Sequence, residues 1–297
     1  MPELPVIQPG RPAEPPPFAK IAIVGVGLIG GSIALAARAR WPAALVIGID
    51  RNDVLERAML RHAIDVGADD LGMAAEADLV ILAAPVRTNV ALVGRLAGML
   101  AGEAVVTDTG STKRAVVAAA RALPPRLVFV GGHPLAGAAR SGIEHARADL
   151  FEGRPWLFTP DATTDPAAVE RLLAFARGLG ARPRTIGPAE HDQLAAFLSH
   201  LPQLAASALM HVVGEAIGED GLGLAGRGLA DTTRLASSPA AIWKDICATN
   251  ADEIGRALDA LIAVLTALRA DLEMGDRLEA IFESAARWRA RLPASGA

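Results

Sequence analysis

The fold is decided by KIAIVGVGLIG, residues 20–30, in which a short apolar strand runs directly into the pattern G-x-G-x-x-G. In such a turn the first glycine permits a tight bend, the second lets the backbone approach a pyrophosphate, and the third lets the following helix pack closely. The N-terminus of that helix favours the negative charge of the phosphates. The stretch therefore predicts a dinucleotide site with these cofactor-binding residues: Gly25, Gly27, Leu28, Ile29 and Gly30.

An acidic residue follows this turn at the distance that a nucleotide-binding unit needs. Residues 44–50 read as a second strand that ends at Asp50, twenty residues after Gly30. A carboxylate there accepts hydrogen bonds from both hydroxyls of the adenosine ribose and repels a 2′-phosphate, which favours NAD over NADP. Arg51 keeps both cofactors open, because its guanidinium can meet a phosphate or simply cover the adenine.

Apolar strands alternate with helical segments through the rest of the first half of the chain. A helix is expected over residues 30–40, core strands over 77–83, 104–108 and 127–131, and edge strands over 156–160 and 182–186. This alternation predicts a parallel sheet covered on both faces, an α/β Rossmann-type doubly wound domain. Ligands bind at the carboxyl ends of such strands, which adds further cofactor-binding candidates: Ala84, Pro85, Asp108, Thr109 and Gly110.

The chain divides into three predicted segments. Residues 1–17 contain seven prolines and no apolar periodicity, so they are expected to be a disordered leader. Residues 18–187 form the dinucleotide-binding domain, and residues 188–297 form an all-α C-terminal domain for substrate binding and dimerisation. A 3.5-residue apolar period in that domain packs either within its own subunit or against a second one: Ile254, Leu258, Leu261, Leu265, Leu268 and Leu272.

Composition excludes several classes of protein. The net charge of −4 over 297 residues offers no basic field for nucleic acid or anionic membrane. The single cysteine, Cys247, permits no intrachain disulfide and indicates the cytoplasm. Residues 21–37 resemble a signal sequence, but four glycines interrupt them, so neither export nor a membrane span is expected. No metal site is expected.

A histidine closes the fifth expected strand in GGHPLAG, residues 131–137. Oxidation of an alcohol needs a proton acceptor, and an imidazole with an ordinary pKa of about 6.5 is largely neutral at pH 7. Together with the dinucleotide motif, His133 predicts a nicotinamide-dependent dehydrogenase. The alternative is a loop histidine that binds a backbone carbonyl.

Several further segments follow in a fixed order: DTGSTK (108–113), GGHPLAG (131–137), SHLPQ (199–203), DTTR (231–234), IWKDI (242–246) and Asn250. Together with the glycine turn they resemble the prephenate and arogenate (cyclohexadienyl) dehydrogenases of tyrosine biosynthesis, from about Lys20 to Trp288. The resemblance implies an NAD-linked oxidative decarboxylation. A hydride leaves the ring carbon that bears the hydroxyl, carbon dioxide leaves the opposite carbon, and the ring becomes aromatic.

The same resemblance implies roles for individual residues. His133 contacts the ring hydroxyl as proton acceptor, and Ser111 bridges the histidine, the nicotinamide and the hydroxyl, although it could also cap the helix that follows. Arg234 holds a substrate carboxylate through its planar fork, or else pairs with Asp231. The remaining substrate-binding candidates are Asp231, Ser199, His200, Gln203 and Thr112, with His200 alternatively a core residue. His191 and Asp192 match the family and are expected to order the domain junction.

The chain also departs from the family pattern. Ala138 and Ala139 stand where many relatives carry Thr-Glu, a glutamate associated with an ionic gate, and Gln203 replaces a histidine. Prephenate, arogenate and an amino-substituted prephenate analogue therefore stay open as substrates. A β-hydroxyacid dehydrogenase is a second reading, but residues 191–209 contain no lysine for its acid-base step. A non-catalytic dinucleotide sensor is a third, disfavoured by His133, Ser111 and Arg234. The expected partners are a small-molecule substrate and a second copy in a homodimer.

Overall fold

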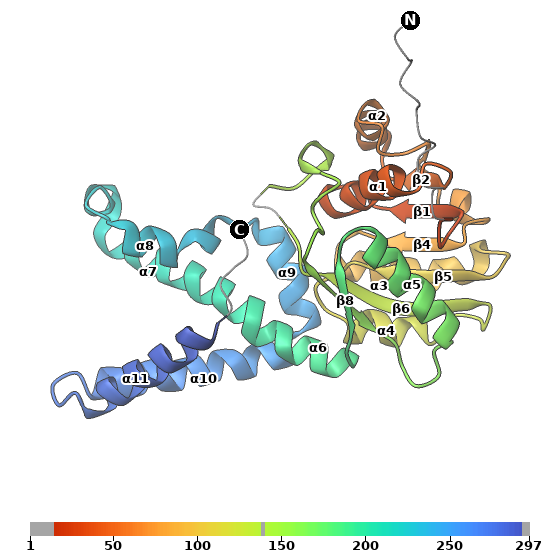
Figure 1. Ribbon diagram of the computed structural model, residues 1–297. Helices are drawn as coiled ribbons and strands as arrows, with labels where there is room; N and C mark the ends of the chain where they lie inside the picture. Colours follow the sequence, from red (N-terminus) through yellow and green to blue (C-terminus); the bar gives the residue numbers. More distant parts are fainter. Residues whose placement is uncertain (1–14, 138–139, 293–297) are drawn as a thin grey trace, which may run out of the picture.

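The computed structural model describes residues 15–137 and 140–292, and its first part is built on one eight-stranded sheet (Figure 1). The strand order is β3-β2-β1-β4-β5-β6-β7-β8. The strands are β1 (Lys20–Val24), β2 (Leu45–Ile49), β3 (Val66–Ala68), β4 (Leu79–Leu82), β5 (Ala104–Asp108), β6 (Leu127–Pro134), β7 (Pro155–Thr159) and β8 (Arg182–Thr185). The order reverses at β1, which pairs with β2 on one side and β4 on the other, so a ligand crevice is expected there.

Helices cover both faces of this sheet because side chains alternate along each strand. In β1, Ile21 and Ile23 pack into one apolar core and Ala22 and Val24 into the other. The first core includes residues of α1 (Leu28–Arg40), α2 (Asn52–Leu60) and α5 (Pro166–Gly178). The second includes residues of η1 (Leu71–Ala74), α3 (Val86–Met99) and α4 (Arg114–Ala120).

The structure confirms the predicted core strands. Both expected edge strands form, but only β8 lies at an edge, because β7 pairs with β6 on one side and β8 on the other. Three further differences follow. β6 runs on to Pro134, so His133 lies within the strand and not after it. β7 pairs antiparallel with β6, whereas a wholly parallel sheet was expected. The short strand β3 has no counterpart among the predictions, because three residues are too few for a hydrophobic period. Residues 1–14, which make up most of the predicted leader, lie outside the described residues.

Helices alone form the second part, which extends away from the sheet in Figure 1. They are α6 (Pro188–Ala195), the π-helical turn η3 (Ala196–His200), α7 (Leu201–Leu222), α8 (Arg227–Thr232), η4 (Arg234–Ser237), α9 (Ala240–Thr249), α10 (Ala251–Ala270) and α11 (Asp276–Arg291). Among these, α9 packs beside α3 of the first part. A small apolar core forms where Ala196 meets Ile246, Ile254 and Ala257.

Much apolar surface on these helices stays exposed. Among the described residues one helical stretch, Pro188–Leu222, is long and apolar enough to cross a membrane, and only 22% of its most apolar window is buried. The 3.5-residue seam of α10 divides along its length. Ile254 is 4% exposed and packs within its own subunit, whereas Leu265 is 55% exposed. Leu272, the last residue of the predicted period, lies beyond the end of α10 and is 67% exposed. Exposed apolar side chains of this kind are typical of an interaction surface.

Candidate functional site

The glycine turn has the geometry of a phosphate-binding loop. Gly25 has φ +95°, and a Cβ there would lie 2.7 Å from the carbonyl oxygen of Ala83. A Cβ on Gly30 would overlap the carbonyl oxygen of Gly25, while a Cβ on Gly27 would meet nothing within 4 Å. The turn is thus closed towards the protein and open at Gly27, which fits the close approach of a pyrophosphate.

Asp50 holds this turn in place from the end of β2. Its Oδ2 accepts a hydrogen bond from the Val26 N–H at 2.7 Å, and its Oδ1 accepts one from the Arg51 N–H at 2.8 Å. Each carboxylate oxygen keeps a further lone pair for a ribose hydroxyl. The Arg51 side chain is exposed, and its Nε lies 3.5 Å from Asp53 Oδ1.

A cavity of about 360 Å³ opens beside the turn and receives most of the predicted cofactor residues. Its walls come from the glycine turn, the loops after β4 and β5, and the helix α9. The predicted residues on its lining are Gly27, Leu28, Ile29, Ala84, Pro85, Thr109, Gly110 and Ser111. Ser111 does not cap α4, because that helix begins at Arg114.

Asp108, predicted to bind the cofactor, and Thr112, predicted to bind the substrate, are not on the lining of this cavity. Asp108 is fully buried and forms an ion pair with Lys113, an equally buried lysine that sequence reasoning did not single out. Its Oδ2 accepts the Gly110 N–H at 2.8 Å and its Oδ1 the Gly132 N–H at 3.1 Å. Asp108 therefore ties the wall of the cofactor cavity to the residue before His133. Thr112 is buried too, and its Oγ1 lies 2.8 Å from Thr249 Oγ1.

His133 lines a separate pocket of about 420 Å³ between β6 and the first helix of the helical part. The pocket also contains the following residues: Pro134, Leu135, Ala136, Gly137, Leu157, His191, Leu194, Ala195, Leu198 and Ser199. Among the described residues no atom forms a hydrogen bond with Nε2 of His133. Burial lowers the pKa of His133 well below its ordinary value, and the neighbouring His191, Lys113 and His200 lower it further. The ring is therefore neutral near pH 7.

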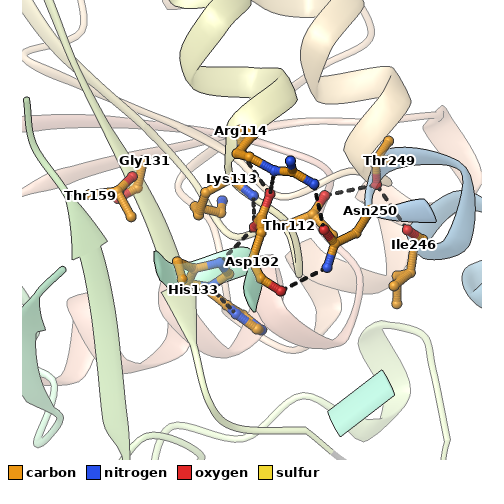
Figure 2. Close-up of polar contacts among 12 residues, drawn as sticks. Thr112, Lys113, Arg114, Gly131, His133, Thr159, Asp192, Ile246, Thr249 and Asn250 are labelled. Atoms are coloured by element: carbon orange, nitrogen blue, oxygen red, sulfur yellow. Dashed lines mark hydrogen bonds and ion pairs between the residues drawn. The ribbon is translucent and has the colours of Figure 1, made fainter. Parts of the chain in front are cut away.

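The other nitrogen of His133 is engaged. Its Nδ1 lies 2.9 Å from Nε2 of His191, whose own Nδ1 lies 2.8 Å from Asp192 Oδ1. Figure 2 shows the Asp192 carboxylate between His133 on one side and Arg114 and Asn250 on the other. This cluster joins β6 and α4 of the first part to α6 and α10 of the second, which agrees with the ordering role expected for His191 and Asp192.

Asp192 also caps a helix of the other part of the molecule. Its carboxylate accepts hydrogen bonds from the backbone N–H groups of Lys113 at 2.6 Å and Arg114 at 3.0 Å. Those are unpaired donors at the start of α4. The Arg114 side chain in turn contacts Asp192 and Asp252, and donates to Asn250 Oδ1 at 2.8 Å. Sequence reasoning missed Arg114 and Asp252, because neither lies in a motif with a chemical reading of its own.

His200 and Gln203 lie behind the pocket and line neither cavity. His200 is 1% exposed, its Nδ1 lies 3.4 Å from Asn250 Nδ2, and burial lowers its pKa to about 4. Gln203 donates to the carbonyl of Leu235 at 2.7 Å and accepts from Ser238 Oγ at 3.0 Å. The structure thus favours the alternative of a core histidine for His200. Gln203 joins α7 to η4 and the residue after it through these hydrogen bonds.

Arg234 and Asp231 lie exposed at η4 and α8 and are not on the lining of either cavity. No ion pair joins the two side chains, and among residues 15–137 and 140–292 the Arg234 guanidinium has no acceptor. The alternative of a structural Asp231–Arg234 pair therefore finds no support. Ala138 and Ala139, where a gate was in question, lie outside the described residues.

Comparison with known proteins gives matches over nearly the whole chain. Residues 33–184 match the nucleotide-binding domain of prephenate dehydrogenase, and residues 187–284 match its dimerization domain. The chain is 38% identical over 281 residues to a prephenate dehydrogenase of Bacillus subtilis, covering 92% of this chain and 76% of that protein. It is 33% identical over 264 residues to a cyclohexadienyl dehydrogenase of Zymomonas mobilis, covering 87% and 90%.

A solved structure agrees with these matches. The crystal structure of prephenate dehydrogenase from A. aeolicus in complex with hydroxyphenyl propionate and NAD+ has a TM-score of 0.84 to this chain at 29% identity. The similarity covers 92% of this chain and 97% of that one.

Proposed function

This chain belongs to the prephenate dehydrogenase family, and we propose on that premise that it oxidises and decarboxylates prephenate, arogenate or both with NAD, a step of tyrosine biosynthesis. We assign His133 as the proton acceptor and Arg234 as the group that holds a substrate carboxylate. One observation carries the assignment of His133. Its Nε2 has no hydrogen-bond partner among the described residues, in a pocket whose strand is tied through Asp108 to the wall of the cofactor cavity.

The chemistry divides between the cofactor and the protein. NAD, when bound, supplies the hydride acceptor. His133 receives the proton of the ring hydroxyl at Nε2, and the lowered pKa of this histidine keeps that lone pair available at neutral pH. Ser111, on the lining of the cofactor cavity, is proposed to orient the hydroxyl between the two.

Arg234 is proposed to bind a carboxylate that enters from solvent. The guanidinium is exposed and lies next to Leu235, whose carbonyl is held by Gln203. A guanidinium without an acceptor is suited to a bidentate bond with an anion. The other residues proposed to lie near the substrate are Ser199, which lines the pocket of His133, and Asp231.

NAD is proposed over NADP because of Asp50. The carboxylate is fixed by two backbone N–H groups at the end of β2, where a 2′-phosphate would meet its negative charge. The exposed Arg51 is engaged with Asp53.

A homodimer is proposed to form through the helical part. Residues 187–284 match a dimerization domain, and the apolar surface of α7, α10 and α11 needs a covering surface. The cytoplasm is the proposed compartment, which the single cysteine supports.

The proposed reaction is tested by absorbance at 340 nm, with prephenate and arogenate each offered with NAD and with NADP. We expect turnover with at least one of the two substrates and a higher kcat/KM with NAD. His133→Asn should lower kcat by at least about a hundredfold while NAD affinity stays nearly unchanged. Undiminished turnover in this variant would remove His133 from the chemistry, and a higher kcat/KM with NADP would overturn the role of Asp50.

A further inference from the structure

A chain of three side chains runs from His133 into the protein. His133 Nδ1 lies 2.9 Å from His191 Nε2, and His191 Nδ1 lies 2.8 Å from Asp192 Oδ1. His191 and Asp192 are 1% and 0% exposed. This row of hydrogen-bonded side chains therefore ends where water does not reach. Which nitrogen of each ring carries a proton is determined by the neighbouring protein groups.

The inner end of the chain is a carboxylate. Burial by itself would raise the pKa of Asp192, but hydrogen bonds with His191, Arg114 and Lys113 together lower the pKa below its ordinary value. An ionised carboxylate only accepts hydrogen bonds. Because Asp192 accepts, Nδ1 of His191 must carry a proton and donate it.

The position of that proton determines the next one. A neutral imidazole has one N–H group, so a His191 protonated on Nδ1 presents a lone pair at Nε2. Facing that lone pair, Nδ1 of His133 must be the donor, and Nε2 of His133 is left with its own lone pair. A charged His191 would reverse this result. However, Arg114 already pairs with Asp192, and because His191 is 1% exposed a second cation would have to be buried next to that ion pair.

We propose that His191, fixed by Asp192, is a positioning residue that holds the proton of His133 on Nδ1 and so leaves Nε2 as the atom that accepts the substrate proton. This inference rests on the function proposed for His133. During oxidation the hydroxyl proton moves to Nε2 of His133, and it returns to the ring oxygen when loss of carbon dioxide makes the ring aromatic, so the product leaves as a phenol. The bond from Nδ1 to His191 persists throughout, so the imidazolium forms in a fixed orientation near the charge of Asp192.

The first test reads the tautomer of His133 directly in the full-length protein labelled with 15N-histidine. The chain has six histidines, and the signals of His133 are identified as those lost in His133→Asn. In the wild-type protein at pH 7.5 we expect the proton of His133 on Nδ1. A proton on Nε2 in the wild type would overturn the proposal.

Two substitutions at the same position separate positioning from packing. His191→Phe removes the acceptor, and the His133 signals should change to a mixture of tautomers or to the Nε2–H form. His191→Gln can place an amide oxygen where Nε2 was, and should keep the wild-type tautomer. His145→Gln removes a histidine that is not part of the row His133–His191–Asp192, and it should leave the signals of His133 unchanged. An unchanged tautomer in His191→Phe would contradict the proposal.

A second test measures kcat and the KM for NAD in the two His191 variants. His191→Phe should lower kcat at least about tenfold with the KM for NAD unchanged, and His191→Gln should recover most of that loss. A purely structural role would instead lower kcat alike in both variants without moving the tautomer. The tautomer is measured without substrate, so it decides the proposal even if His133→Asn were to remain active and the proposed function were to fail.

Discussion

At the scale of the residue, environment determines what each imidazole of this protein can do. His133 opens into a pocket, and its Nε2 has no hydrogen-bond partner in the part of the chain that the structure describes, while His200 is enclosed beside Asn250 and Trp243. Both have lowered pKa values because burial disfavours the charged ring. The same physical effect keeps the ring of His133, the proposed proton acceptor, neutral and makes the charged form of His200 unfavourable in the folded protein.

Arg234 provides a test of substrate binding at this scale. Arg234→Gln removes the charge and the fork, and loss of charged hydrogen bonds should raise the KM for prephenate roughly 10- to 100-fold with kcat nearly unchanged. Steady-state kinetics at saturating NAD measure both parameters. Arg227→Gln, which removes an exposed arginine at the start of α8, is the control and should change neither. An unaltered KM in Arg234→Gln would mean that another cation binds the substrate carboxylate.

The buried His200 predicts how stability depends on pH. Its pKa is about 4 in the folded protein against 6.5 for an unperturbed histidine, so the unfolded chain binds a proton first as the pH falls. The stabilisation is complete above pH 6.5 and is lost progressively down to pH 4. Between pH 7 and pH 4.5 this residue should account for a loss of roughly 2–3 kcal/mol in the free energy of unfolding.

Urea unfolding of the wild type and of His200→Phe at both pH values, at one protein concentration, measures that loss. The difference between the two pH values should be smaller in His200→Phe by about the stated amount. His62→Asn removes an exposed imidazole and should leave the pH dependence as it is in the wild type. Equal pH dependence in His200→Phe and the wild type would show that His200 does not carry it.

At the scale of the element, a side chain of α6 caps the N-terminus of α4 across the junction between the two parts. The start of α4 has no cap from its own side chains, and Asp192 at the middle of α6 supplies the missing acceptor. The π-helical turn η3 follows directly and carries Ser199 and His200. Such turns are frequent at functional sites because they displace side chains from the regular helical face.

Asp192→Asn tests this capping. The amide turns an N–H group towards donors and leaves Arg114 without its buried partner, so the free energy of unfolding should fall by about 3 kcal/mol. Thermal or urea unfolding at pH 7.5 measures it. Asp252→Asn removes the exposed partner of the same arginine and should cost less than about 1 kcal/mol. Equal losses in the two variants would mean that the buried cap contributes nothing of its own.

At the scale of the whole molecule, the two parts have different surfaces. The sheet buries its apolar side chains on both faces, whereas the helical part has a core of few residues and many exposed apolar ones. Exposed surface of this kind is typical of an interface. The exposed apolar side chains include Leu265 near the end of α10, Leu272 just beyond that helix, and Phe282 and Trp288 of α11.

The proposed dimer predicts a specific loss of assembly. The wild-type protein should sediment with twice the mass of the chain, and Leu265→Asp, which places a charge in the apolar surface, should sediment with the mass of one chain. Leu60→Asp, at an exposed leucine of α2 in the sheet part, should remain dimeric. A dimer unaffected by Leu265→Asp would place the interface elsewhere.

Sequence alone accounted for the features that depend on neighbouring residues. The glycine turn, the core strands, the helical second half and the histidine of β6 follow from spacing and hydrophobic period, which act over a few residues. The same holds for the family, whose segments follow one another along the chain. These features are readable because the residues that determine them are close together in the chain.

Tertiary structure decided how the pieces meet. His133 and His191 are 58 residues apart and come into contact only when β6 packs against α6, and Lys113 pairs with Asp108 behind a cavity wall that no spacing rule describes. Folding likewise divided the α10 seam into a covered end and an exposed one. Contacts of this kind depend on how elements distant in the sequence pack together. They cannot be predicted from any local segment of the sequence.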